Sequence, residues 1–182
     1  MLFKAIEFAA KAHNGQYRKA SRLPYIVHPI GVAKLLIEHD CPEEVVIAGI
    51  LHDTVEDTSV TRAELLDEFG EKVAHLVEGA SEADKRDVWE NRKQQFIESL
   101  KTADEEVLLV VCADKVDNIR SIREDYAKMG EAVWARFSRP KEKQGWYFRA
   151  VINTLGPRLT ENPGRSLLKQ LQEEVQNIFE DS

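Results

Sequence analysis

The segment that most constrains the fold of this chain is EEVVIAGILHD, residues 43–53, which is apolar on almost every side of a predicted helix before it ends in His52 and Asp53. A helix that is hydrophobic all round belongs at the centre of a protein. A buried carboxylate is costly unless it is paired or bound to a metal ion. The segment therefore predicts a central helix that delivers an imidazole and a carboxylate to an interior site.

Local signals predict further helices around this segment. Pro42 is placed at the first position of the apolar helix, with acidic residues following it as the helix dipole favours. The stretch Thr61–Glu64 matches a capping box, a pattern that begins a helix. Gly70 is placed to end the short helix that follows.

The second half of the chain also favours helices. The apolar run Val107–Cys112 is rich enough in β-branched residues for a strand, but helical spacing continues beyond it to about Tyr126. A last amphipathic helix is predicted over residues 165–180, after a segment with several Gly and Pro residues. We therefore expect an all-α helical bundle that forms a single domain over residues 1–182.

The composition narrows the classes of function. The 182 residues include 32 acidic and 25 basic side chains, a net charge of −7 that argues against general nucleic-acid binding. The longest apolar run, Val107–Ala113, is far shorter than a membrane span, and the N-terminus lacks the features of an export signal. Cys41 and Cys112 are too few for a disulfide framework. We expect a cytoplasmic protein with no membrane or nucleic-acid partner. Assembly of the chain into a homo-oligomer is left as an open alternative.

Side chains of the types that bind metal ions interrupt the apolar segments. His28 lies at the start of a predicted helix, and Asp114 breaks the run VLLVVCADKVDNI, where packing alone favours an apolar group. With His52 and Asp53 they provide two imidazoles and two carboxylates, a mixed set able to hold Mn²⁺, Fe²⁺, Co²⁺ or Zn²⁺. A His-Asp pair by itself has a simpler interpretation, in which two adjacent polar residues lie where a helix reaches the surface.

An acidic pair follows the proposed ligands. Glu56 and Asp57 lie three and four residues beyond Asp53, so one helical turn would place them beside such an ion. Carboxylates in that position can orient a water and take its proton. The alternative is that the two acids merely begin a solvated turn.

Taken together, these motifs resemble a known family. The pattern His28, His52-Asp53 and Asp114 is similar to that of HD-domain metal-dependent phosphohydrolases. The closer resemblance is to the hydrolase domain of the RelA/SpoT family, especially the stand-alone small alarmone hydrolases, which include the metazoan SpoT homologue. It covers about residues 1–155 and is carried by the segments AAKAHNGQYRKASRLPYIVHPIGVAKLL (9–36), ILHDTVEDT (50–58), FGEKVAHLVEGAS (69–81) and VCADKVDNIRSI (111–122).

The resemblance implies an HD-domain helical bundle that holds a single Mn²⁺ and removes the 3′-pyrophosphate from (p)ppGpp, a small nucleotide, leaving GDP or GTP. It implies metal binding by His28, His52, Asp53 and Asp114, and catalysis by Glu56 and Asp57. The substrate-binding residues that it implies are Arg18, which stacks on the base, its neighbour Lys19, Asn118 near the ribose, and Lys143 and Tyr147 near the phosphates.

The chain departs from the family pattern in three places. Residues 82–91 differ, 128–146 is longer and more aromatic, and Val116-Asp117 stands where a Leu–His or Leu–Tyr pair is common. Hydrolysis of an adenine analogue such as (p)ppApp, or of a nucleoside 5′-monophosphate, therefore stays open, as does a non-catalytic nucleotide-sensing module. Because the chain ends at Ser182, we expect no synthetase domain to follow.

Overall fold

The computed structural model describes residues 1–18, 22–82 and 86–179, which fold almost entirely as helices. Within these ranges there is no β-strand, and Tyr17 and Pro24 form an isolated antiparallel bridge. The predicted all-α class is confirmed. No helix in the described ranges has the length and apolar character needed to cross a membrane. The elements, in chain order, are α1 (Leu2–Ala12), α2 (Val27–Glu38), α3 (Glu43–Leu51), α4 (Thr54–Asp57), α5 (Arg62–Phe69), α6 (Glu71–Ala80), α7 (Trp89–Leu100), α8 (Glu105–Met129), the 3₁₀ helix η1 (Gly130–Arg136), α9 (Lys141–Leu155) and α10 (Gly164–Phe179).

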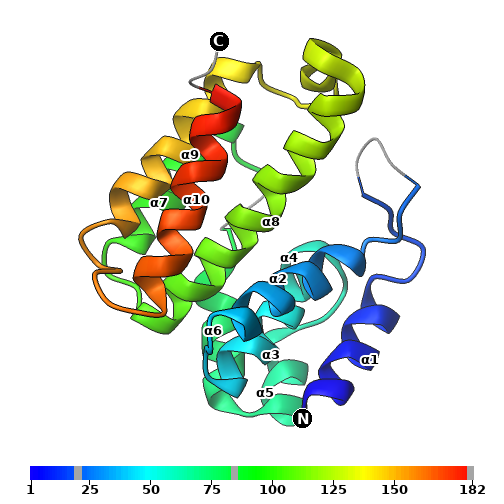
Figure 1. Ribbon diagram of the computed structural model, residues 1–182. Helices are drawn as coiled ribbons and strands as arrows, with labels where there is room; N and C mark the ends of the chain where they lie inside the picture. The colour runs from blue at the N-terminus through cyan, green and yellow to red at the C-terminus, as the bar shows by residue number, and fades with distance from the viewer. Residues whose placement is uncertain (19–21, 83–85, 180–182) are drawn as a thin grey trace.

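The long helix α8 is the central element of the fold (Figure 1). It contacts α2, α3 and α6 on one side and α10 on the other. Every residue from Val107 to Val116 is buried, including the polar residues Asp114 and Lys115. The run Val107–Cys112 is therefore helical rather than extended, because burial between two groups of helices outweighs the β preference of its valines.

Helix α3 is buried, as the sequence predicts. Every residue from Val45 to Leu51 is buried, and the helix packs against α1, α2, α6 and α8. The predicted start is wrong by one residue. Pro42 is the N-cap, because its extended ψ of 150° keeps it outside the helix, which begins at Glu43. The other end of α3 leads directly into His52 and Asp53, so these two residues enter the interior of the bundle.

The predicted signals around α5 are confirmed. The Thr61 side chain accepts a hydrogen bond from the backbone N–H of Glu64, and the Glu64 side chain accepts one from the backbone N–H of Thr61. Gly70 has a φ of +85°, a conformation that costs glycine little. This residue allows the chain to turn sharply from α5 into α6.

The C-terminal helix α10 lies along α8 and contacts α9 (Figure 1). Its buried face includes Leu167, Leu171 and Glu174. Glu174 accepts hydrogen bonds from Arg120 Nε at 2.9 Å and from Arg123 Nη1 at 2.5 Å, both on α8. The helix predicted over residues 165–180 is confirmed over the described residues, which end at 179.

Candidate active site

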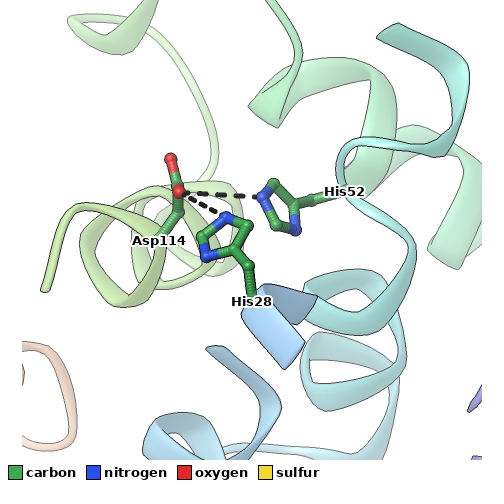
Figure 2. A group of neighbouring side chains, drawn as sticks. All are labelled: His28, His52 and Asp114. Atoms are coloured by element: carbon green, nitrogen blue, oxygen red, sulfur yellow. Dashed lines mark ion pairs between the residues drawn. The ribbon is translucent and has the colours of Figure 1, made fainter. Parts of the chain in front are cut away.

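The four predicted metal ligands converge from separate parts of the chain. His28 is the second residue of α2, and His52 follows the last residue of α3. Asp53 caps the start of α4, and Asp114 lies near the middle of α8. Figure 2 shows His28, His52 and Asp114 pointing toward one another, His28 from α2, Asp114 from α8 and His52 from the turn that follows α3. We call these four residues the metal group.

The distances within the metal group suit a single ion. His28 Nε2 lies 3.1 Å from Asp114 Oδ1 and 3.5 Å from Asp53 Oδ2. His52 Nε2 lies 3.7 Å and 3.0 Å from the same two oxygens. The candidate ligand atoms of His28, His52 and Asp114 all lie within 4.8 Å of one another. Each carboxylate therefore faces both imidazoles.

Hydrogen bonds on the far side of each imidazole orient the rings. His52 Nδ1 bonds the backbone carbonyl of Gly49 at 2.8 Å, and His28 Nδ1 bonds Oδ2 of Asp117 at 2.6 Å. Both partners are acceptors, so each neutral ring carries its proton on Nδ1 and presents the lone pair of Nε2 to the metal group. His52 Nε2 is buried and lacks a hydrogen-bond partner in the part of the chain described, as expected for an atom that binds a metal ion.

Both carboxylates of the metal group are ionised despite their surroundings. Burial alone would raise the pKa of Asp114, but the Lys115 ammonium, 2.6 Å from Oδ2, and the two imidazoles hold that pKa well below its ordinary value. Burial also opposes ionisation of Asp53, but the positive charge of protonated His52 outweighs it and keeps the pKa of Asp53 low, and Asp53 in turn raises the pKa of His52. Metal binding requires both imidazoles in the neutral form, and two negative oxygens with two neutral nitrogens then fit a divalent ion such as Mn²⁺, Fe²⁺, Co²⁺ or Zn²⁺.

The acidic pair lies next to the metal group in sequence and at the wall of a cavity in space. Glu56 and Asp57 belong to the single turn of α4, which begins directly after Asp53. Glu56 Oε2 accepts a hydrogen bond from the backbone N–H of Glu82 at 3.0 Å. The backbone carbonyl of Asp57 accepts one from Gln16 Nε2 at 2.8 Å. The two acids lie in one helical turn after Asp53, and their placement beside a metal ion and their catalytic role stay predictions.

A cavity of about 780 Å³ lies beside the metal group. Its wall includes Tyr25, Lys115 and Asn118, and each of these hydrogen-bonds a carboxylate of the metal group. Basic side chains gather there although the chain is acidic overall, namely Arg18, Arg92, Lys93, Lys115 and Arg136. The Nε atoms of both Arg92 and Arg136 are buried and lack hydrogen-bond partners among the described residues. This wall favours an anionic ligand.

The cavity contains three of the predicted substrate-binding residues. Arg18, Asn118 and Tyr147 line it, and Asn118 Nδ2 also donates to Asp114 Oδ1 at 2.5 Å. Lys143 lies in the first turn of α9, where its side chain is exposed, and it is not among the described residues of the cavity wall, to which α9 contributes Gln144 and Tyr147 instead. Lys19 lies outside the described residues.

Sequence reasoning missed three residues that contact the metal group, namely Tyr25, Lys115 and Asp117. Asp117 lies one turn after Asp114 on α8, so helical spacing could have pointed to it. Lys115 directly follows Asp114, and its only signal is a second charged residue within the same apolar run. Tyr25 gives no such signal, because its partner Asp53 is 28 residues away in sequence.

The fold and this group define a helical domain built around a His/Asp site for a divalent metal ion. A family profile of the HD domain matches residues 5–142, and the chain belongs to the HD-domain family.

Curated relatives are much longer than this chain. Guanosine-3′,5′-bis(diphosphate) 3′-pyrophosphohydrolase of Aquifex aeolicus is 40% identical over 121 residues, which is 65% of this chain and 17% of that protein. The protein of the same name from Borreliella burgdorferi is 30% identical over 179 residues, 96% of this chain and 24% of the relative. GTP pyrophosphokinase of Myxococcus xanthus is 40% identical over 129 residues, 65% of this chain and 17% of the relative. The chain thus spans less than a quarter of these relatives.

Two solved structures share the fold over most of both chains. A protein of Listeria monocytogenes EGD-e is 36% identical, with a TM-score of 0.76 over 84% of this chain and 99% of that one. A metazoan orthologue of SpoT, reported to hydrolyse ppGpp, is 27% identical, with a TM-score of 0.79 over 97% of this chain and 94% of that one. The resemblance drawn from the motifs is confirmed.

Proposed function

We propose that this chain is a metal-dependent hydrolase that removes the 3′-pyrophosphate from (p)ppGpp and leaves GDP or GTP. The observation that carries the proposal is the metal group itself, in which both imidazoles present Nε2, and Asp53 and Asp114 each present an oxygen, to one point. A divalent ion, which we propose is Mn²⁺, supplies there a Lewis acid for the phosphoryl group and an activated water. The names of the Aquifex and Borreliella relatives support this choice of nucleotide.

The acidic pair takes the proton of the attacking water. The carboxylate of Glu56 is held at the cavity wall by the backbone N–H of Glu82, and Asp57 follows it in the same turn. An ionised carboxylate close to a water can act as its general base. We assign this step to Glu56 and assign to Asp57 the orientation of the same water.

The basic wall of the cavity suits a substrate with two diphosphate groups. Lys93 forms an ion pair with Glu82 and lies over the ring of Tyr147, with Nζ 4.4 Å from the ring centroid. Burial raises the pKa of the Tyr147 phenol, which therefore stays protonated and can donate to a phosphate oxygen. The buried Nε donors of Arg92 and Arg136 would bind further phosphate oxygens.

The base and the ribose have candidate partners on the same wall. The Arg18 side chain is only 16% exposed, and a planar guanidinium held in this way can stack on a purine while it retains its charge. Asn118 is one turn from Asp114 and lines the cavity, a position that fits a contact with the ribose.

The test is a product analysis with several nucleotides. The purified protein, loaded with Mn²⁺, is incubated separately with ppGpp, ppApp, GTP and dAMP, and the products are separated by anion exchange. We expect pyrophosphate and GDP from ppGpp. The variant Asp53→Ala should release neither, whereas Lys169→Ala, which changes an exposed residue of α10, should match the wild type.

The same assay decides between substrate classes. Pyrophosphate from ppApp alone would move the specificity to adenine nucleotides. Phosphate released from dAMP alone would refute the proposal and identify a nucleoside 5′-monophosphatase.

A further inference from the structure

Asp117 lies between the metal group and the loop that carries Arg18. It is on α8, one turn after Asp114, and is half-buried. Its Oδ2 lies 2.6 Å from Nδ1 of His28 and 3.7 Å from Nη2 of Arg18. One carboxylate oxygen therefore contacts a member of the metal group and a residue of the cavity wall.

The contact with His28 determines which nitrogen of that ring is free to bind a metal ion. An ionised carboxylate only accepts hydrogen bonds, so Asp117 keeps the proton of a neutral His28 ring on Nδ1. Nε2 then presents its lone pair to Asp53 and Asp114. His52 is held in the same form by a backbone carbonyl. His28 depends instead on a side chain from another helix, 89 residues away in sequence.

Helix α2 leaves room for this carboxylate. A Cβ atom at Gly31, one turn after His28, would lie 2.1 Å from Oδ1 and 3.0 Å from Cγ of Asp117. Non-bonded atoms do not approach so closely, so any larger residue at position 31 displaces the Asp117 carboxylate. Glycine is unfavourable inside a helix, and here the space that it leaves is filled by the group that contacts His28.

We propose that Asp117 is a positioning residue with two tasks. It fixes the tautomer and the orientation of His28, and it anchors the guanidinium of Arg18 at the cavity wall. The first task follows from the contacts alone, and the second rests on the proposed function, in which Arg18 holds the base. His28 requires a hydrogen-bond acceptor, whereas Arg18 requires a negative charge, so the two tasks can be separated.

Two substitutions of Asp117 make this separation. Asp117→Asn keeps an oxygen that can accept from His28 but removes the charge that faces Arg18, and Asp117→Ala removes both. We expect Asp117→Ala to weaken Mn²⁺ binding, measured by calorimetry, by about 10–100-fold, as is usual when the hydrogen-bond partner of a ligating histidine is lost. Asp117→Asn should retain nearly the Mn²⁺ affinity of the wild type but raise KM for ppGpp. The exposed control Asp67→Asn should change neither quantity.

Two further measurements address the first task without any substrate. In metal-free protein at alkaline pH, the ¹⁵N shifts of the five histidines should show His28 with its proton on Nδ1 in the wild type and a changed signal for this ring in Asp117→Ala. Gly31→Ala should reproduce the loss of Mn²⁺ affinity while Asp117 is still present. Unchanged Mn²⁺ affinity and unchanged His28 signals in Asp117→Ala would overturn this task.

A double variant addresses the second task. If Asp117 acts on nucleotide binding through Arg18, Arg18→Ala/Asp117→Asn should have the same KM as Arg18→Ala alone. A further rise in KM would give Asp117 a substrate contact of its own and overturn the second task. A wild type with the expected tautomer and Mn²⁺ affinity that hydrolyses no ppGpp would refute the proposed function and the Arg18 task, and would leave the His28 task supported.

Discussion

Tyr25 Oη donates a hydrogen bond of 2.5 Å to Oδ2 of Asp53, the same oxygen that faces Nε2 of both histidines of the metal group. Its ring lies 4.8 Å from that of His13 and 5.8 Å from that of His28, measured between centroids. Burial, and then the charge of Asp53, raise the pKa of Tyr25, so the phenol stays protonated and able to donate. The packed ring therefore holds the Asp53 carboxylate in one orientation.

Removal of this hydroxyl should weaken the metal group without emptying it. We expect Tyr25→Phe to reduce Mn²⁺ affinity about 10-fold or more, because a ligating carboxylate that loses its hydrogen-bond partner is less well oriented. Calorimetric titration of metal-free protein measures this change. Tyr126→Phe, on the distal part of α8, is the matched control and should bind Mn²⁺ as the wild type does. Equal affinities in the two variants would show that Asp53 needs no support from Tyr25.

Metal removal should destabilise the fold. A ligand that binds only the native state adds about 4 kcal/mol to the free energy of unfolding at 1,000 times its dissociation constant. We therefore expect a chelator to lower the Tm of the wild type but not that of Asp53→Ala, which lacks a ligand. Elemental analysis should find one divalent ion per wild-type chain. Undiminished metal in Asp53→Ala would contradict the assignment of Asp53.

The acidic pair should affect turnover rather than metal binding. Glu56→Gln keeps the shape of the side chain but removes the proton acceptor, so kcat should fall on the order of 10²–10⁴-fold with metal content and KM retained. Asp57→Asn should act in the same direction. If both acids act on one water, the fold-reduction of kcat in the double variant should be smaller than the product of the two single reductions.

The control for this pair is Glu173→Gln, which changes an exposed residue of α10. Loss of the metal ion from Glu56→Gln would show that Glu56 is a metal ligand rather than a general base. Wild-type turnover in both single variants would mean that neither acid accepts the proton.

Arg18 should contribute to nucleotide binding. We expect Arg18→Ala to raise KM for ppGpp more than it lowers kcat, because a stacked guanidinium holds the base in both the ground state and the transition state. Steady-state kinetics of Arg18→Ala and of the exposed control Arg165→Ala separate the two parameters. A large fall in kcat at unchanged KM would place Arg18 at the reacting phosphate.

Helix α10 should unfold together with the metal-binding part of the chain. Leu171 is fully buried where α10 meets α8 and α9, so Leu171→Ala should lower the free energy of unfolding by about 2–5 kcal/mol. We expect one cooperative transition, followed by circular dichroism in urea, as for a single domain. Two separate transitions, or a stability equal to that of Lys169→Ala, would show that α10 is an independent appendage.

Local patterns in the sequence were sufficient to predict much of the fold. The capping box at Thr61 and the turn at Gly70 depend on neighbours within one helical turn, and both are present. The apolar segment that ends in His52 could be placed in the centre because a helix without a polar face has no exposed alternative. Asp114 was conspicuous for the same reason, as a charged residue within a buried run.

The tertiary structure alone decided which side chains surround these residues. Asp117 reaches His28 because α2 and α8 pack together where Gly31 leaves space, and no pattern within either helix encodes that packing. Lys143 and Tyr147 are one turn apart on α9, yet Tyr147 is buried at the cavity and Lys143 is exposed. Residues one turn apart share a helix face, so the difference comes from how far the contacts of α9 with α7 and α10 extend along that face, and these depend on residues far apart in the chain. The sequence by itself therefore determined the helices and the candidate metal ligands. The packing of distant helices decided the hydrogen-bond partners of those ligands and the residues of the cavity wall.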